Sequence, residues 1–224
     1  SDLAHRWPTH VVPNTVDTDF WHRTGDGLPT QLTSLAADEV LLICGLDRGL
    51  SSWVKGADLF YSMLRHLPEF LGSPDSPKVR VAVFGNSSDA PESLPFETHN
   101  LGLLNDEELR ALFSTATVTV AASRVENFNQ VALESLACET PVVAFDTAGL
   151  PEIVLPGVNG ELVEAFDVLK MAASVADLLK NTARARLLGS TGRDWVRDTL
   201  HPRVIADQYC AVLESIISEF SSSR

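Results

Sequence analysis

The sequence predicts an α/β fold in which helices cover both faces of a doubly wound parallel sheet and the chain ends in helices. Apolar segments of strand length alternate with segments whose apolar residues recur at helical spacing. This βαβ alternation is typical of a Rossmann-like domain. The expected strands are 40–44, 79–84, 118–121, 141–145 and 161–163. The expected helices are 55–66, 106–114, 130–137, 168–180, 182–200 and 204–220, the second of them with a capping box formed by Asn105 and Glu108.

Composition favours one domain with extensions. A chain of 224 residues with 45% hydrophobic content can bury a sizeable core. We therefore expect an interdomain or linker segment over 1–37, a Rossmann-like domain over 38–200, and a C-terminal helix and tail over 201–224. The chain opens with Ser1, which suggests a processed protein or a fragment of a longer one.

The net charge of −13 argues against a nucleic-acid partner, because nucleic-acid-binding proteins show a basic face. Small-molecule ligands fit this charge better. No apolar run is long enough for a transmembrane segment. Cys44, Cys138 and Cys210 lie in apolar sequence, so we expect buried thiols in a reducing compartment, the cytoplasm.

Glu126 and Glu134 are the centre of the predicted site, eight positions apart. On one continuous helix this spacing would separate their backbones by ~12 Å and about 80°, which places both on one side. The unpaired N–H groups at the helix start, over 127–130, would attract an anion such as a diphosphate. A carboxylate on either side of an anion suggests acceptors for hydroxyl groups. The pattern therefore indicates a nucleotide sugar.

Simpler interpretations exist for the same residues. Two glutamates on a helix usually form a solvated face. In this interpretation Asn127 and Asn129 simply cap the helix, and Phe128 simply fills the core.

The segment as a whole resembles the donor-site signature of the family 4 retaining glycosyltransferases, which have a GT-B fold. The resemblance rests on Glu126, seven intervening residues, Glu134, the strand 141–145 and the run Ala148-Gly149-Leu150-Pro151-Glu152, and it extends from about 12 to 163. It implies that the catalytic Glu126 holds hydroxyls of the transferred sugar and that Glu134 holds the ribose. It also implies that the backbone of Asn127, Phe128, Asn129 and Gln130 lies near the diphosphate, and that no metal or cofactor is required.

Further residues of the sugar-donor site follow from the same resemblance. The loop after the first strand begins at Gly45 and ends at Lys55-Gly56, where the lysine would contact the diphosphate. The family usually has an arginine directly after the first glycine, where this chain has Leu46, and Arg48 is the candidate substitute. The backbone near Leu103 would face the nucleobase.

The chain departs from the family pattern at three glycines. Thr15, Glu139 and Ala148 stand where glycine is usual. Glycine at a helix end relieves left-handed strain, so Glu139 either accepts that strain or the helix ends differently.

We interpret the chain as the C-terminal, donor-binding half of a retaining hexosyltransferase that uses a UDP- or GDP-type nucleoside diphosphate sugar. The acceptor, a glycan, a lipid or a small molecule, would be held by a missing N-terminal domain, so this chain alone should be inactive. Two alternatives stay open: a non-catalytic nucleotide-sugar-binding module, and a sugar-nucleotide epimerase of the same architecture. Asp17-Thr18-Asp19 matches the Asp-x-Asp motif of metal-dependent glycosyltransferases, but nothing else supplies the further oxygen ligands that a hard cation needs.

Overall fold

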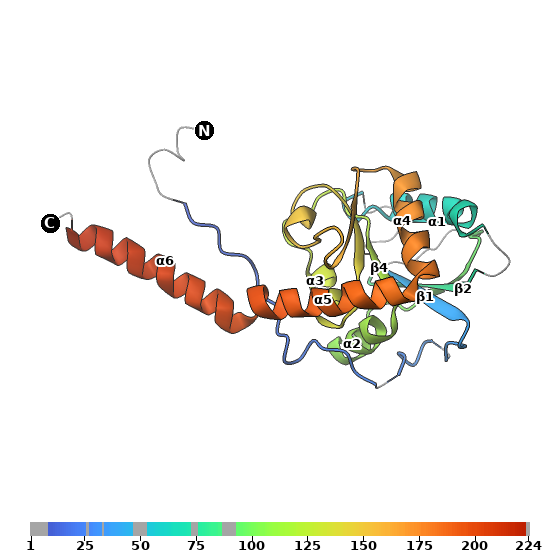
Figure 1. Ribbon diagram of the computed structural model, residues 1–224, viewed down its shortest axis with the longest axis horizontal. Helices are drawn as coiled ribbons and strands as arrows, with labels where there is room; N and C mark the ends of the chain where they lie inside the picture. The colour runs from blue at the N-terminus through green and yellow to red at the C-terminus, as the bar shows by residue number, and fades with distance from the viewer. Residues whose placement is uncertain are drawn as a thin grey trace.

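A six-stranded parallel sheet forms the centre of the computed structural model, which describes residues 9–25, 27–32, 34–46, 53–72, 76–86 and 93–222. The strands lie in the order β3-β2-β1-β4-β5-β6, and Figure 1 labels β1, β2 and β4 in the middle of the sheet. The chain reverses its direction of winding between β1 and β4, which are paired in parallel. At such a switch point the loops beyond the carboxyl ends of the strands enclose a crevice. The strands are β1 Glu39–Gly45, β2 Lys78–Phe84, β3 Glu97–Asn100, β4 Val118–Ala121, β5 Val142–Phe145 and β6 Gly160–Val163.

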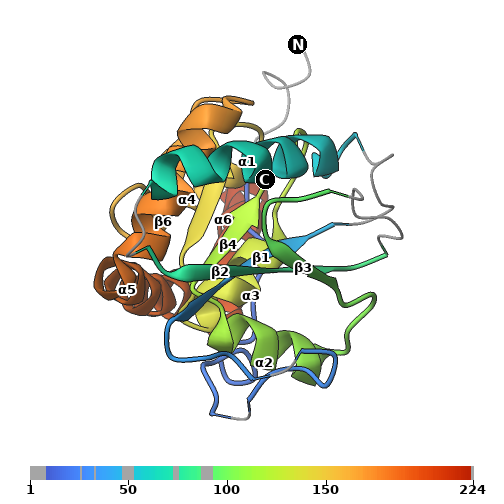
Figure 2. The ribbon, with the colours of Figure 1, turned by 90° about the vertical axis from the view of Figure 1, so that its right-hand side faces the viewer.

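Helices cover both faces of this sheet (Figure 2). Leu42 and Cys44 of β1 point into a core shared with α1 and α4, whereas Leu41 and Ile43 point into a second core shared with α2, α3 and α5. Burial on both faces explains why the central strands are continuous apolar runs. The helices are α1 Ala57–Leu71, α2 Asp106–Thr115, α3 Gln130–Ala137, α4 Val168–Lys180, α5 Thr182–Leu200 and α6 Pro202–Ser222, with a short 3₁₀ turn, η2, at Leu150–Glu152.

The predicted fold class is confirmed, and most elements begin and end within two residues of their expected bounds. The capping box of α2 is present, since Asn105 accepts from the backbone of Glu108 and Glu108 accepts from that of Asn105. Helix α1 differs most: it begins two residues later than expected, after Gly56, and runs past Pro68 to Leu71. Strand β3 was not predicted, because its residues Glu-Thr-His-Asn contain no apolar run and it forms the edge of the sheet.

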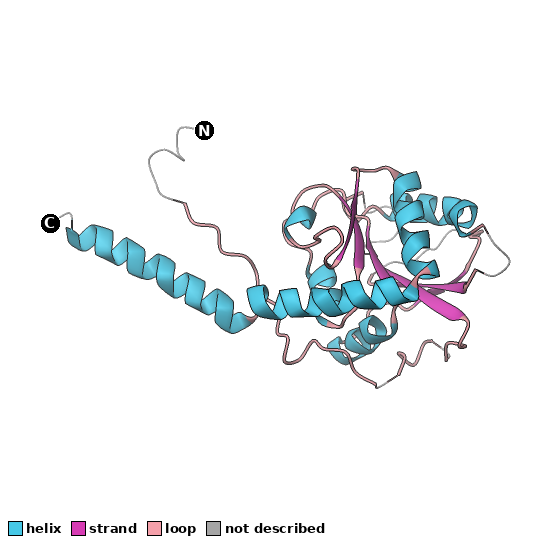
Figure 3. Ribbon diagram, viewed as in Figure 1, coloured by secondary structure: helices cyan, strands magenta, loops and turns pink. Residues whose placement is uncertain are grey.

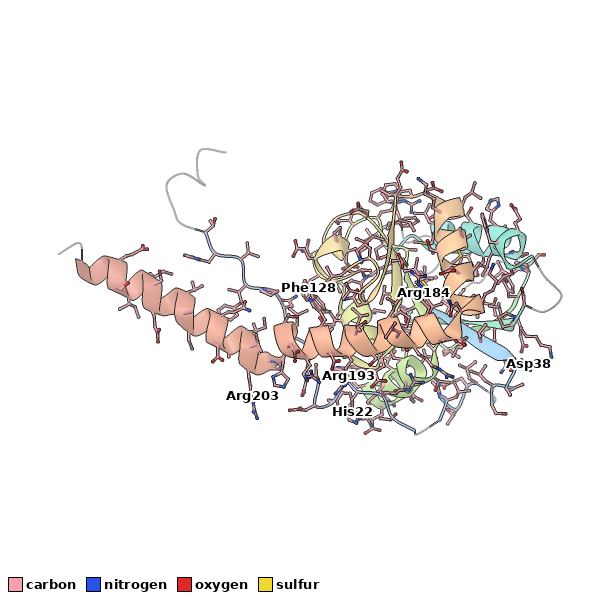
Figure 4. The ribbon with its side chains drawn as sticks, in the orientation of Figure 1. His22, Asp38, Phe128, Arg184, Arg193 and Arg203 are labelled. Carbon is pink, nitrogen blue, oxygen red and sulfur yellow. The ribbon has the colours of Figure 1, made fainter. Side chains whose placement is uncertain are left out.

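The segment before β1 packs against the helical layer instead of standing free. Val16 and Trp21 are buried in the core beneath α2, α3 and α5. Arg193 of α5 donates hydrogen bonds to the carbonyl oxygens of Trp21 at 2.9 Å and Thr18 at 3.3 Å (Figure 4). The segment also continues toward the start of α6, because the backbone N–H of Val16 donates to the carbonyl of Leu200.

Helix α6 extends away from the body of the domain (Figure 3). Its side chains Tyr209, Leu213 and Ile217 are more than half exposed. Cys210 is exposed on the same helix, so the expectation of three buried thiols is wrong for this cysteine and holds for Cys44 and Cys138. No helix in the described part of the chain has both the length and the apolar content to cross a membrane.

Candidate functional site

Loops from three neighbouring strands touch at the carboxyl edge of the sheet, and two glycines permit this contact. A Cβ atom on Gly56 would lie 1.9 Å from the carbonyl oxygen of Ala122, and one on Gly149 would lie 2.1 Å from that of Asn127. The N–H of Gly149 also donates to the carbonyl oxygen of Glu126 at 2.9 Å. The loops after β1, β4 and β5 therefore converge where the expected sugar-donor site lies.

Lys55 and Glu126 meet at this convergence. The ammonium Nζ of Lys55 lies 2.8 Å from Oε2 of Glu126, and the two side chains are 31% and 15% exposed. Ser123 Oγ and Asn129 Nδ2 approach the same oxygen at 3.3 Å each. Within the described part of the chain, these contacts all fall on Oε2. The carboxylate is thus held in one orientation by three donors on a single oxygen.

Asn129 connects this carboxylate to the helix that follows. Its Oδ1 accepts from the backbone N–H of Ala132, which caps α3, while its Nδ2 donates to Glu126. The helix begins at Gln130, four residues after Glu126, so the expected geometry of one helix carrying both glutamates is wrong. The backbone over 122–129 is not helical, and Asn129 takes an extended conformation at the cap, where the helix starts. Glu126 instead lies in front of the first turn of α3.

Glu134 lies in α3 with its carboxyl group largely removed from water. Burial, together with the charge of Asp106 on α2, raises the pKa of Glu134 to about 7. No described cation forms an ion pair with it. A carboxyl group whose pKa is shifted by burial and by a neighbouring charge is a candidate for a functional role.

The remaining predicted residues fall around the same edge. Asn127 is exposed, and Phe128 is half-buried against the core layer of α3. Gln130 is exposed, and its Nε2 donates to the carbonyl oxygen of Thr15 in the segment before β1 at 3.3 Å. Gln130 therefore already contacts the protein itself as well as lying in the first turn of the helix.

The loops after β1 and β3 supply the other predicted positions. Gly45 ends β1 and packs against the Phe84 ring, where a Cβ atom would lie 3.0 Å from the nearest ring atom. Leu103 follows β3 and is 77% exposed. Arg48 lies outside the described residues.

Of the three residues that stand where the family usually has glycine, two adopt the left-handed backbone conformation that glycine favours. Glu139 has φ 63° and Ala148 has φ 52°. Of the two possibilities stated for Glu139, the first is therefore correct: the residue accepts the strain. The backbone path that glycine would allow is kept at both positions.

Sequence reasoning missed two residues of this site. Ser123 contacts the Glu126 carboxylate, and Arg124 donates to the turn that carries Lys55. Both lie in the loop between the end of β4 and Glu126, and this position is the only signal of them in the sequence.

The Asp17-Thr18-Asp19 motif has a structural role. Oδ1 of Asp17 accepts from the backbone N–H groups of Asp19 at 3.0 Å and Phe20 at 3.3 Å, which closes a turn. Across the described ranges no group of three or more His, Cys, Asp or Glu side chains is arranged to hold a metal ion.

A cavity of about 690 Å³ lies at the opposite, amino-terminal edge of the sheet. Lys78, Thr117 and Pro141 line it, and none of the predicted site residues does. We place the candidate site at the carboxyl edge because the Lys55–Glu126 pair, the start of α3 and the isolated Glu134 lie there.

A family model of glycosyltransferases matches this chain, and so does a sequence relative that is named as one. Residues 49–195 match the family model of the glycosyl transferases group 1. D-inositol 3-phosphate glycosyltransferase from Xylanimonas cellulosilytica is 31% identical over 202 residues, which cover 82% of this chain and 46% of that protein. The chain spans about half the length of the curated relatives it matches.

Solved structures share the fold. Sucrose-phosphate synthase from Thermosynechococcus elongatus superposes with a TM-score of 0.76 at 23% identity, over 97% of this chain and 56% of that one. Anabaena HepE, solved in complex with UDP, superposes with a TM-score of 0.71 at 18% identity, over 92% of this chain and 57% of that one. The predicted resemblance is confirmed by the family model, which covers more than half of the sequence. The chain belongs to the glycosyl transferases group 1 family.

Proposed function

We propose that this chain is the sugar-donor-binding domain of a retaining glycosyltransferase that moves a hexose from a nucleoside diphosphate sugar to an acceptor. The observation that carries the proposal is the contact between Lys55 and Glu126 in front of the first turn of α3. It places a cation, a fixed carboxylate and the start of a helix, with its N–H groups, within one small region. A diphosphate joined to a sugar offers the matching charges and hydroxyl groups.

Each side chain then has a chemical role. Lys55 and the N–H groups of α3 bind the diphosphate and stabilise the negative charge that grows on it as the bond to the sugar breaks. Glu126 accepts hydrogen bonds from hydroxyls of the sugar and orients the ring. Glu134 accepts hydrogen bonds from the ribose, farther along α3.

The acceptor side of the reaction belongs to a part of the protein outside this chain. The relatives are about twice as long, and transfer needs a second surface that holds the acceptor and excludes water. We therefore propose that residues 1–224 bind the nucleotide sugar and transfer none of it. Appreciable transfer by this chain alone would contradict that assignment.

A thermal-shift panel of UDP, GDP, ADP and their sugars tests the proposal. A ligand that binds only the folded state raises the melting temperature. We expect one nucleoside diphosphate and its sugar to raise it in a concentration-dependent way, with the free sugar as the inactive control. The UDP bound by HepE makes UDP the first choice. If no nucleoside diphosphate or nucleotide sugar binds, the proposed function is wrong.

A further inference from the structure

Arg124 joins the loop after β4 to the turn that carries Lys55. Its Nη1 donates to the carbonyl oxygen of Trp53 at 3.0 Å, and its backbone N–H donates to the carbonyl oxygen of Val54 at 2.8 Å. Both acceptors immediately precede Lys55 in sequence. One residue therefore holds two consecutive carbonyl groups of the turn.

The same guanidinium also holds the start of α1. Nη1 and Nη2 donate to the two carboxylate oxygens of Asp58 at 2.7 and 2.6 Å, a bidentate arrangement. These hydrogen bonds hold the pKa of Asp58 below its usual value. Asp58 lies in the first turn of α1, so Arg124 contacts the chain on both sides of Lys55 and Gly56.

Two aromatic rings restrict the guanidinium further. Its Cζ lies 5.5 Å from the centre of the Trp53 ring and 5.9 Å from that of Phe166. Phe166 is held at φ 67°, and its ring packs edge-on against the buried Phe145. The Arg124 side chain is only 13% exposed, so this is an ordered contact and not a solvated loop arginine.

The turn has little other freedom. Gly56 takes a left-handed conformation against the carbonyl of Ala122, and its own carbonyl accepts the first hydrogen bond of α1 from Phe60. Lys55 therefore stands between Val54, held by the backbone of Arg124, and Gly56, held against the end of β4. Glu126 lies two residues after Arg124 on the same loop.

We propose that Arg124 is a positioning residue: by fixing residues 53–58 to the loop that carries Glu126, it sets Lys55 at the distance from Glu126 that diphosphate binding requires. It acts through Lys55 and contacts no ligand itself. This inference rests on the proposed function. A lysine at position 124 would keep the positive charge but would lack the planar guanidinium, whose N–H groups reach Asp58 and Trp53 at the same time.

A double-mutant cycle tests this role. Binding of the preferred nucleoside diphosphate from the panel of UDP, GDP and ADP is measured by calorimetry for the 224-residue chain, Arg124→Lys, Lys55→Gln and the double variant. We expect Lys55→Gln to weaken binding by roughly 10- to 100-fold, the loss of a charge-assisted hydrogen bond. Arg124→Lys should weaken it by about 3- to 10-fold, and should add nothing in the Lys55→Gln background, because its effect passes through Lys55.

The matched control is Arg197→Lys. Arg197 forms ion pairs with Asp194 and Asp198 on its own helix α5 and contacts neither Lys55 nor Glu126 in the described residues, so the substitution should leave affinity unchanged. If Arg124→Lys weakens binding equally with and without Lys55, or does not weaken it at all, the positioning role is wrong. If Arg124→Lys does not fold, Asp58→Asn, which removes one half of the bidentate pair, replaces it in the same cycle.

The outcomes separate this inference from the proposed function. When the unmodified chain binds no nucleoside diphosphate, the proposed function fails and the positioning role fails with it. When the chain binds and Lys55→Gln weakens binding but Arg124→Lys does not, only the positioning role is overturned.

Discussion

The ammonium of Lys55 lies 2.8 Å from the carboxylate oxygen Oε2 of Glu126, although 71 positions separate the two residues in sequence. The parallel pairing of β1 with β4 brings them together, because each follows the carboxyl end of its strand. In the proposed complex the same ammonium has a diphosphate on one side and the sugar-binding carboxylate on the other. Lys55 should therefore contribute to the binding affinity of every ligand that carries a diphosphate.

Lys55→Gln should weaken both the nucleoside diphosphate and its sugar by about 1.5–3 kcal/mol, the worth of a hydrogen bond to a charged group. The loss should shrink as salt rises, since part of the attraction is screened. Calorimetry at two ionic strengths measures both effects. Lys78→Gln is the matched control, because it removes the same charge at the amino-terminal edge, beside Asp38. Equal losses in the two variants would show that only net charge matters.

Glu134→Gln should make the folded chain more resistant to urea at high pH. Burial raises the pKa of Glu134 to about 7, above the value of about 4.5 expected in the unfolded chain, so the native state disfavours the charged form. Stability is therefore unaffected by this group below pH ~4.5, falls as pH rises toward about 7, and stays lowered above it.

The expected gain of Glu134→Gln is at most about 3 kcal/mol at pH 8, and it should disappear near pH 4.5. Urea unfolding of both proteins at pH 4.5, 6 and 8 gives the difference in the free energy of unfolding at each pH. Glu214→Gln, an exposed change on α6, is the control and should show no such trend. A gain that is independent of pH would mean that the carboxyl group titrates normally.

Glu139→Gly should stabilise the chain, because Glu139 sits at φ 63° where a side chain is strained. Relief of that strain is offset in part by the greater freedom of glycine in the unfolded chain, so the net gain is expected to be about 0.5–1 kcal/mol. Urea unfolding checks this value. Ala183→Gly, an exposed position within α5, should instead cost about 1 kcal/mol. A loss at both positions would show that the Glu139 side chain has a stabilising contact.

The sequence was informative about the fold where hydrophobicity follows burial. The inner strands β1, β2, β4 and β5 are apolar because both of their faces are buried, and each was expected near its observed bounds. The edge strand β3 carries no such pattern, since its Thr98 and His99 are only half-buried. Segment 97–100 is a strand because it is hydrogen-bonded to β2, and this pairing cannot be recognised from the residues of the segment itself.

The sequence indicated which residues to consider for the candidate site, but it predicted only part of their arrangement in space. The identity of Lys55, Glu126 and Glu134 as candidates came from sequence, and so did the start of the helix at Gln130. The spacing of the two glutamates, however, was that of one continuous helix, and the backbone between Glu126 and Gln130 is not helical. Capping by Asn129 was one of the interpretations that the sequence offered, but the sequence does not reveal that the same side chain also donates to Glu126. Contacts such as that of Arg124 with Asp58 join distant segments, and a single sequence contains no record of them.

The two glutamates should be separable by the ligand used, because each carboxylate is proposed to contact a different part of it. A nucleoside diphosphate has a ribose but no transferred sugar, so it reports on Glu134 and not on Glu126. Glu134→Ala should weaken both the diphosphate and the nucleotide sugar by about 1.5–3 kcal/mol. Glu126→Ala should weaken only the nucleotide sugar.

The ion pair with Lys55 sharpens the second half of this prediction. Removing the Glu126 carboxylate leaves the ammonium of Lys55 with more of its charge for the diphosphate, so affinity for the bare diphosphate should stay equal or rise in Glu126→Ala. Calorimetry with the preferred diphosphate and its sugar gives four comparisons, after circular dichroism confirms that both variants are folded, and Glu214→Ala serves as the exposed control. If Glu126→Ala weakens the bare diphosphate as much as the sugar form, or Glu134→Ala weakens neither, then the roles proposed for these two carboxylates are wrong in this protein.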